Sequence, residues 1–202
     1  MNKLPTRHRD EGPTGSLVVV FLRRWWPLVA LAALAVVATV WAWSTKDVRS
    51  LGFSGPSPSL LGALLGPFVH ASVLHLLGNI AVGGVFAAAL VADRPDRAGL
   101  TTLGLVALFS VGAAAGEVWW WLGQHDATLV GASAGIAAWV GAAARRRVPR
   151  SWKLWAAVVA VLVLGAVAEP ASGAVHAVGF AVGFAATGWP GRDAARRARV
   201  PI

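Results

Sequence analysis

Six apolar segments alternate with short polar or charged stretches along the chain. They cover residues 27–43, 68–92, 100–122, 133–144, 155–168 and 174–189. The longest reach the roughly 20 apolar residues that a helix needs to cross a bilayer. Between the first two segments, four leucines at helical spacing (Leu60, Leu61, Leu64 and Leu65) predict a short helix in the membrane interface. The pattern predicts an all-α polytopic membrane protein, a bundle of six transmembrane helices.

The fourth segment is too short to cross the bilayer. Ser133 to Ala144 is 12 residues, and a helix of that length covers roughly 18 Å, against roughly 30 Å of hydrocarbon. Arg145 to Arg147 follow and belong at the cytoplasmic interface, because a buried Arg costs at least roughly 2.5 kcal/mol. We expect a short fourth helix that starts mid-membrane, with Ser133 about 10 Å below the opposite surface. Irregular backbone at that depth is tolerated only where protein surrounds it or where it lines a water-filled cavity. A serine buried at that depth beside such a cavity suggests a hydrolase that works inside the membrane.

Composition and charge agree with a membrane protein and exclude several classes. The 202 residues are 56% hydrophobic and 13% charged, which is typical of membrane domains. The absence of cysteine excludes disulfides and thiolate metal sites. The net charge of +9 stands in short clusters beside apolar segments, where cations set topology and attract anionic lipid headgroups. We expect the lipid bilayer as a partner and no nucleic acid.

The distribution of cations predicts the orientation. Six spans put both termini on one side, and if that side is the cytoplasm it holds 16 of the 18 Lys and Arg residues. The positive-inside rule then predicts a multi-pass plasma-membrane protein with both termini cytoplasmic. The predicted organisation is a disordered tail over residues 1–22, a membrane domain over 23–190 and a basic tail over 191–202. A cleavable signal peptide competes for the first segment, but that run is long and ends in Trp41 and Trp43.

The polar residues within the segments are the functional candidates, because buried polar groups are expensive in a bilayer. They are His70, His75, Asn79, Ser110, Glu117, Ser133 and His176. His75 and Asn79 are four residues apart and so share one helix face. Stripes of small residues follow the last two: Ala137 and Gly141 after Ser133, and Gly179 and Gly183 after His176. Such stripes let helix backbones approach closely, so Ser133 and His176 are expected within hydrogen-bonding reach.

This pairing would supply a nucleophile and its base. An imidazole that takes the proton of Ser133 makes attack on a carbonyl feasible. The resulting oxyanion needs preset donors, which the Asn79 amide, the His75 ring and the Ser133 N–H could provide. No carboxylate is well placed to orient His176, so the prediction is a dyad without a cofactor. A zinc site from His70, His75 and Asn79 would lack a third strong ligand.

Three motifs in this order resemble the rhomboid family of intramembrane serine proteases. They are His70 with His75 and Asn79, then Gly131-Ala132-Ser133, then His176 with Gly179 and Gly183. The resemblance covers all six spans and implies a rhomboid-like bundle with Ser133 as nucleophile and His176 as general base. It implies oxyanion binding by His75, Asn79 and the Ser133 N–H, with His70 organising the loop above. Gly131, Gly135, Gly179 and Gly183 would be structural, and substrates would be single-span membrane proteins that enter between the second and fifth spans.

Two features depart from the family pattern. Ala134 follows the serine where the family usually has glycine, and the first outer loop lacks the common Trp-Arg pair. Helix packing near Ser133 could therefore differ, and the anchoring of that loop is unexplained.

Several alternatives stay beside this interpretation. Ser133 could be a helix N-cap, and His75 and Asn79 could join helices by hydrogen bonds. Glu117 could be solvated near the outer rim. G-x-S-x-G also marks α/β-hydrolases, but six apolar segments exclude that context. A catalytically inactive rhomboid-like protein that binds transmembrane helices is the main functional alternative. A transporter is disfavoured because no internal repeat is visible, and the oligomeric state is open.

Overall fold

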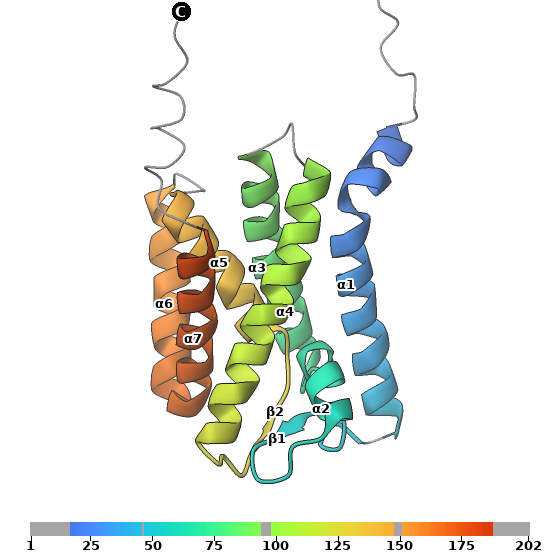
Figure 1. Cartoon of the computed structure of the whole chain (residues 1–202), viewed down its shortest axis with the longest axis vertical. Coiled ribbons are helices and arrows are strands. Elements are labelled where there is room, and N and C mark those ends of the chain that lie inside the picture. The colour runs from blue at the N-terminus through green and yellow to red at the C-terminus, as the bar shows by residue number, and fades with distance from the viewer. Residues whose placement is uncertain (1–16, 46, 94–97, 148–150, 188–202) are drawn as a thin grey trace, which may run out of the picture.

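The protein is a helical bundle, as the apolar pattern predicts (Figure 1). The computed structural model describes residues 17–45, 47–93, 98–147 and 151–187. Residues 1–16 and 191–202 of the predicted tails lie outside these ranges, whereas residues 17–22, which were predicted to belong to the disordered tail, are helical and begin α1. The helices are α1 (Leu17–Thr45), α2 (Leu60–Leu65), α3 (Val73–Ala92), α4 (Ala98–Leu122), α5 (Ser133–Arg146), α6 (Trp152–Ala168) and α7 (Pro170–Ala186). A 3-10 turn, η1 (Gly66–Phe68), and two short strands, β1 (Phe53–Ser54) and β2 (Thr128–Leu129), complete the described elements.

Within the described ranges, three helices are long and apolar enough to cross a membrane. They are Trp25–Thr45, Val73–Ala92 and Thr101–Leu122, in α1, α3 and α4. Each exposes large apolar side chains, such as Val37, Leu77 and Val111, which is unfavourable in water and natural in lipid. The six crossings, and the depth at which α5 begins, stay predictions.

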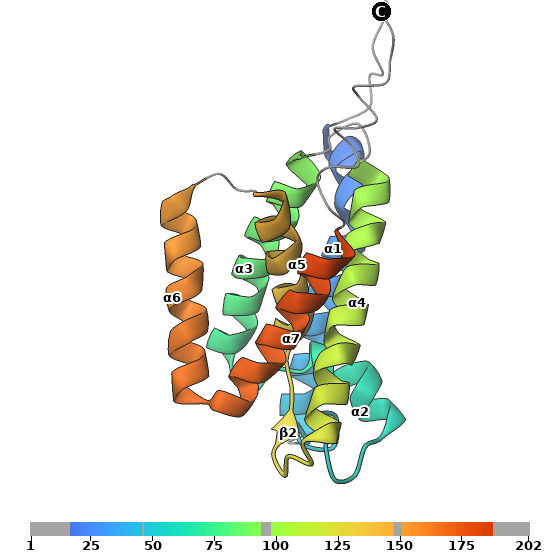
Figure 2. The same cartoon turned by 60° about the vertical axis from the view of Figure 1, so that its left-hand side comes forward.

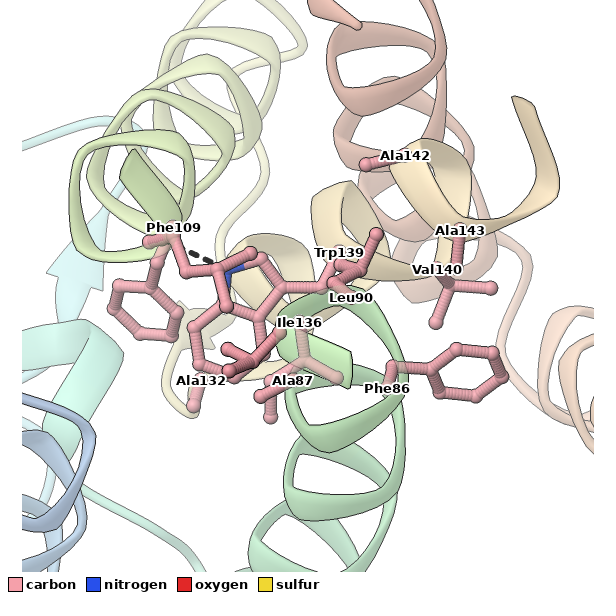
Figure 3. Close-up of a cluster of buried hydrophobic side chains, with 12 residues drawn as sticks. Phe86, Ala87, Leu90, Phe109, Ala132, Ile136, Trp139, Val140, Ala142 and Ala143 are labelled. Carbon is pink, nitrogen blue, oxygen red and sulfur yellow. Dashed lines mark hydrogen bonds between the residues drawn. The ribbon is translucent and has the colours of Figure 1, made fainter. Parts of the chain in front are cut away.

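The short helix α5 is the buried centre of the bundle. Every residue from Ala134 to Ala143 is buried, and α5 packs on α7, α4 and α3 (Figure 2). The ring of Trp139 lies among Ile136, Phe109 and Leu90, and its Nε1 donates to the Leu105 carbonyl at 2.7 Å (Figure 3). The helix is therefore surrounded by protein along its length.

The predicted starts of two helices are wrong. The second segment was expected to be helical from Phe68, but α3 begins at Val73, after η1 and an extended stretch. Pro67 lies in η1, and Ser72 caps α3 by accepting the His75 N–H at 3.1 Å. His70 consequently lies in the loop before α3. The sixth segment was expected from residue 174, but α7 begins at Pro170, because proline suits the first helical turn.

A small antiparallel pair ties the first outer loop to the loop before α5. Phe53 pairs with Leu129 and Ser54 with Thr128. The Trp120 indole on α4 donates to the Ala127 carbonyl at 2.8 Å and so fixes the end of the second loop. This pairing anchors the first loop without a Trp-Arg pair. It lies at the end of the bundle opposite the start of α1 and the end of α7 (Figure 1).

Candidate active site

The loop before α5 lies against one face of α3. Gly131 has a φ of 107°, which L side chains rarely adopt, and its N–H donates to the Gly66 carbonyl at 2.9 Å. A Cβ built at Gly131 would lie 2.7 Å from His75 Cε1 and 3.6 Å from Asn79 Nδ2. The backbone two residues before Ser133 therefore touches the His75 ring, and glycine leaves room for this contact.

Asn79 offers unused hydrogen-bond donors at this place. It lies one turn after His75, so both side chains share the face of α3 that meets the loop. Its Nδ2 is buried and has no hydrogen-bond partner within the described part of the chain. Unpaired donors of this kind are what a developing oxyanion requires.

Ser133 is the first residue of α5 and is half-buried. Ala132 occupies the N-cap position, with φ −71° and ψ −2°, and no side chain caps the helix. The first N–H groups of a helix have no partner within it and form the positive end of its dipole. The structure does not use Ser133 as an N-cap, and the free N–H groups face the end where the loop from Gly131 arrives.

The backbones of α5 and α7 are in direct contact. A Cβ at Gly179 would touch the Ala134 carbonyl, one at Gly183 the Ala138 carbonyl, and one at Gly141 the Phe180 carbonyl. The close approach agrees with the predicted stripes, but the row on α5 is Ala134, Ala138 and Gly141, one residue away from the predicted Ser133 and Ala137. Because of this shift, Ser133 lies outside the packed row and lines a hollow beside it.

His176 lies on α7 at the level where α5 begins. Val175 packs against Ala134, and Gly179, one turn after His176, also contacts Ala134. Within the described ranges, neither the Ser133 side chain nor the His176 side chain makes a hydrogen bond. The two helices thus meet at the level the dyad needs, and the Ser133–His176 dyad itself stays a prediction.

Among the described residues, His75 and Glu169 are ionisable groups close enough to act electrostatically on His176. Glu169 precedes α7, is exposed and makes no side-chain capping hydrogen bond. It is the carboxylate that sequence reasoning did not consider for His176. Over the ranges that the structure describes, no three His, Cys, Asp or Glu side chains are grouped as a metal site would need.

Glu117, which the sequence suggested to be solvated, lines a small hollow beside Ser133. Glu117, Ser133, Gly131 and Val175 line a space of about 10 Å³, which has room for about one water molecule. Glu117 is 8% exposed, and its Oε1 has no hydrogen-bond partner in the described part of the chain. The interpretation of Glu117 as a solvated rim residue is therefore wrong. The sequence offered one signal for the burial of Glu117. Ala113, one turn earlier on the same face of α4, is a small residue of the kind found where helices pack, and it is buried beside the same hollow.

His70 lies fully buried between α1 and the loop before Ser133. Its Nε2 is 3.5 Å from the Ala132 N–H, and its ring meets the His75 ring edge-on at 5.0 Å. Burial, and then the neighbouring His75, lower the pKa of His70 to about 4, although the Phe68 carbonyl acts in the opposite direction. His70 is therefore neutral near pH 7.

Two glycines, one on α4 and one on α5 itself, make room around the first turn of α5. A Cβ at Gly116 on α4 would lie 2.9 Å from the Ala134 methyl group, so the absence of a side chain at 116 accommodates the alanine that departs from the family pattern. Gly135 lies against the ring of Phe109, where a side chain would not fit.

A larger apolar cavity of about 400 Å³ lies between α1 and α3. Ala35 and Gly84 line it, as do Asn79 and Ala132, while Ser133 is not among its lining residues. Of the candidate residues, Ser133 lines the small hollow, whereas Asn79 and His70 line the large cavity.

Comparison with known proteins supports one family. Residues 63–191, well over half of the chain, match the family model described as Rhomboid domain. No curated protein and no solved structure matches the chain. The matched range includes every candidate residue from His70 to His176. The chain therefore belongs to the rhomboid family of membrane proteins.

Proposed function

We propose that this protein is an intramembrane serine endopeptidase, which cleaves single-span membrane proteins within or near their transmembrane segment. The supporting observation is the contact of Gly179 with Ala134, together with the contact of Gly131 with His75. These contacts bring α3 and α7, which carry His75 and His176, against the residues on either side of Ser133 and so support a site that combines an alcohol, two imidazoles, an amide and helix N–H groups. That set matches the requirements of acyl transfer.

In the proposed reaction, Ser133 Oγ attacks the carbonyl carbon of the scissile peptide bond while His176 accepts the hydroxyl proton. The carbonyl electrons move to oxygen, and the Ser133 N–H, the Asn79 amide and the His75 ring bind the oxyanion. Collapse breaks the C–N bond, and His176 gives its proton to the leaving amine. Water then attacks the acyl ester by the same steps and regenerates Ser133. Catalytic hydrogen bonds often tighten only when substrate binds, so the unformed Ser133–His176 bond is compatible with this sequence.

The proposed location is the plasma membrane, with both termini cytoplasmic and the site opening toward the other side. The chain contains no cysteine, so single cysteines can be introduced without background. A membrane-impermeant maleimide added to intact cells should label Ser57→Cys in the first outer loop and spare Ser151→Cys before α6. The reverse labelling would refute the orientation.

A catalytically inactive rhomboid-like protein that binds transmembrane helices is the second candidate. The missing hydrogen bond between Ser133 and His176 favours it. Such a protein would use the same fold to hold a partner helix, without acyl transfer.

A fluorophosphonate probe distinguishes the two candidates. It should label the wild type and spare Ser133→Ala. It should also label the control Ser110→Ala, because the Ser110 hydroxyl of the wild type bonds only to the Val106 carbonyl of its own helix. His176→Ala should react much more slowly, because the base is lost. Absence of labelling in wild type that is folded by circular dichroism would refute proteolysis and favour the inactive protein.

A further inference from the structure

A threonine on α1, which the sequence analysis did not single out, lies at the centre of a buried hydrogen-bond group. Thr39 is 0% exposed. Its Oγ1 is 3.1 Å from the Phe68 carbonyl, 3.1 Å from the His70 backbone N and 3.2 Å from His70 Nδ1. A second α1 residue, Trp43, donates its indole N–H to the His70 carbonyl at 2.9 Å. The loop around His70 is therefore attached to α1 at several points.

The chemistry of these partners determines which nitrogen of His70 is protonated. The Phe68 carbonyl can only accept and the His70 backbone N–H can only donate, whereas the Thr39 hydroxyl has one hydrogen to give, either to that carbonyl or to an unprotonated Nδ1. A proton on Nδ1 has two acceptors at 3.2 Å, Thr39 Oγ1 and the Phe68 carbonyl, whereas a proton on Nε2 would face the Ala132 N–H. The Nδ1–H tautomer is therefore the one that satisfies every partner, and it leaves the lone pair of the neutral ring on Nε2.

That lone pair faces the backbone next to the nucleophile. His70 Nε2 is 3.5 Å from the N–H of Ala132, the residue at the N-cap position before Ser133. The opposite tautomer would place a hydrogen between two donors and break this contact. A hydroxyl on α1 thus determines whether the start of α5 is held by the ring.

We propose that Thr39 is a positioning residue of the active site: it fixes His70 as the Nδ1–H tautomer, and the ring then holds the Ala132 N–H and the backbone of Ser133 in place. This inference rests on the proposed protease function. Thr39 does not touch substrate; it acts through His70 on the geometry of the nucleophile. Loss of its hydroxyl should therefore slow the chemical step more than it weakens substrate binding.

The test compares Thr39→Val, which removes the hydroxyl at nearly constant shape, with Thr39→Ser, which retains it. Thr45→Val is the matched control, because the Thr45 hydroxyl bonds only to carbonyls of its own helix. We expect Thr39→Val to lower kcat about 10- to 100-fold, the effect of a small displacement of reacting groups, with KM changed less than about twofold. Thr39→Ser and Thr45→Val should remain within about threefold of wild type.

Nitrogen-15 NMR of protein labelled at its 5 histidines and held in bilayers reads the tautomer directly, with His70→Gln to assign the signal. The wild type should show a protonated Nδ1 and an unprotonated Nε2, and Thr39→Val should show mixed tautomers. A wild-type ring protonated on Nε2 overturns the proposal without any variant, even if Thr39→Val does not fold. Unchanged kcat in Thr39→Val, or failure of Thr39→Ser to restore it, also overturns it. The tautomer measurement needs no activity, so its outcome is separate from failure of the protease proposal, which the fluorophosphonate probe reports.

Discussion

The replacement of Gly183 by alanine tests the contact on which the site depends. The added Cβ would touch the Ala138 carbonyl oxygen and lie 2.8 Å from the Ala138 Cα, whereas carbon atoms pack at roughly 3.5–4 Å. The obstacle is the backbone of the central helix, which has no side-chain freedom to yield. The helix α7 must therefore move away by roughly 1 Å.

The expected cost follows from two opposing terms. Overpacking of this kind costs about 1–3 kcal/mol, and alanine regains about 0.5–1 kcal/mol of helix propensity over glycine. The difference between these terms is a net loss of stability of roughly 0–2.5 kcal/mol, and overlap with rigid backbone places Gly183→Ala in the upper part of that range. The same movement displaces His176, two turns earlier on α7, and a displacement near 1 Å lowers kcat by about 100-fold.

Gly104→Ala is the matched control, since a Cβ at that position on α4 meets no atom within 4 Å. Stability is measured by equilibrium unfolding in micelles, followed by the fluorescence of the 11 tryptophans. Activity is measured on a fluorescent single-span substrate. The control should match wild type in activity and equal or exceed it in stability. A Gly183→Ala variant as stable and active as the control would refute the described packing of α7 on α5.

Three further predictions concern the site. Gly131→Ala should abolish cleavage without changing helical content by circular dichroism, because its φ of 107° and the His75 ring 2.7 Å from a new Cβ exclude a side chain; an active variant would contradict this. Glu117→Leu should lower kcat at least about tenfold while Glu117→Gln retains most of it, because a polar side chain at this position can hydrogen-bond a water molecule that enters the hollow; equal kinetics would refute that role. Since the pKa of His70 in the folded protein is about 4, below the ordinary 6.5, the unfolded state binds the proton more tightly, so stability should be constant above about pH 6.5 and fall toward pH 4. His70→Gln should lack that part of the pH dependence in unfolding measurements, and identical curves would contradict it.

The apolar pattern predicted where the helices lie better than where they begin. Residues from Phe68 onward are apolar enough to continue a helix, but Pro67 and the Ser72 cap delay the start of α3 to Val73. Hydropathy reports burial and is insensitive to the backbone conformation of short apolar stretches. His70 was consequently assigned to a helix, although its role in the structure depends on its place in a loop.

Other features depended on the register between helices, which a sequence without contacts does not contain. Both Ser133 and Ala134 are small, so either row on α5 could meet the glycines of α7, and the structure uses the row with Ala134. Glu117 was predicted to be solvated because it lies near the end of α4 in the sequence. The sequence did not show that its side chain points toward α5 and is buried. Thr39 was overlooked because a threonine is common in apolar helices, where its hydroxyl usually bonds its own backbone.

The start of α5 has no side-chain cap, so its neighbours determine its position. α1 holds it through His70, α3 through the contact of His75 with Gly131, and α7 through the contact of Gly179 with Ala134. None of these contacts is an ion pair. Uncharged contacts avoid the desolvation cost of several kcal/mol per ion that a salt bridge would have in a low-dielectric interior.

A difference in sensitivity follows from this construction. The ion pair between Arg146 and Asp93, 3.8 Å apart, is partly exposed, and pairs of that kind contribute about 0–1 kcal/mol. Asp93→Asn should therefore leave stability within about 1 kcal/mol and leave cleavage unchanged, whereas a single methyl group at Gly179 should greatly reduce cleavage. Measurement of both variants on one substrate decides the matter. If loss of the charge were the more harmful change, the nucleophile would be positioned by electrostatics, and the account based on close backbone contact would be wrong.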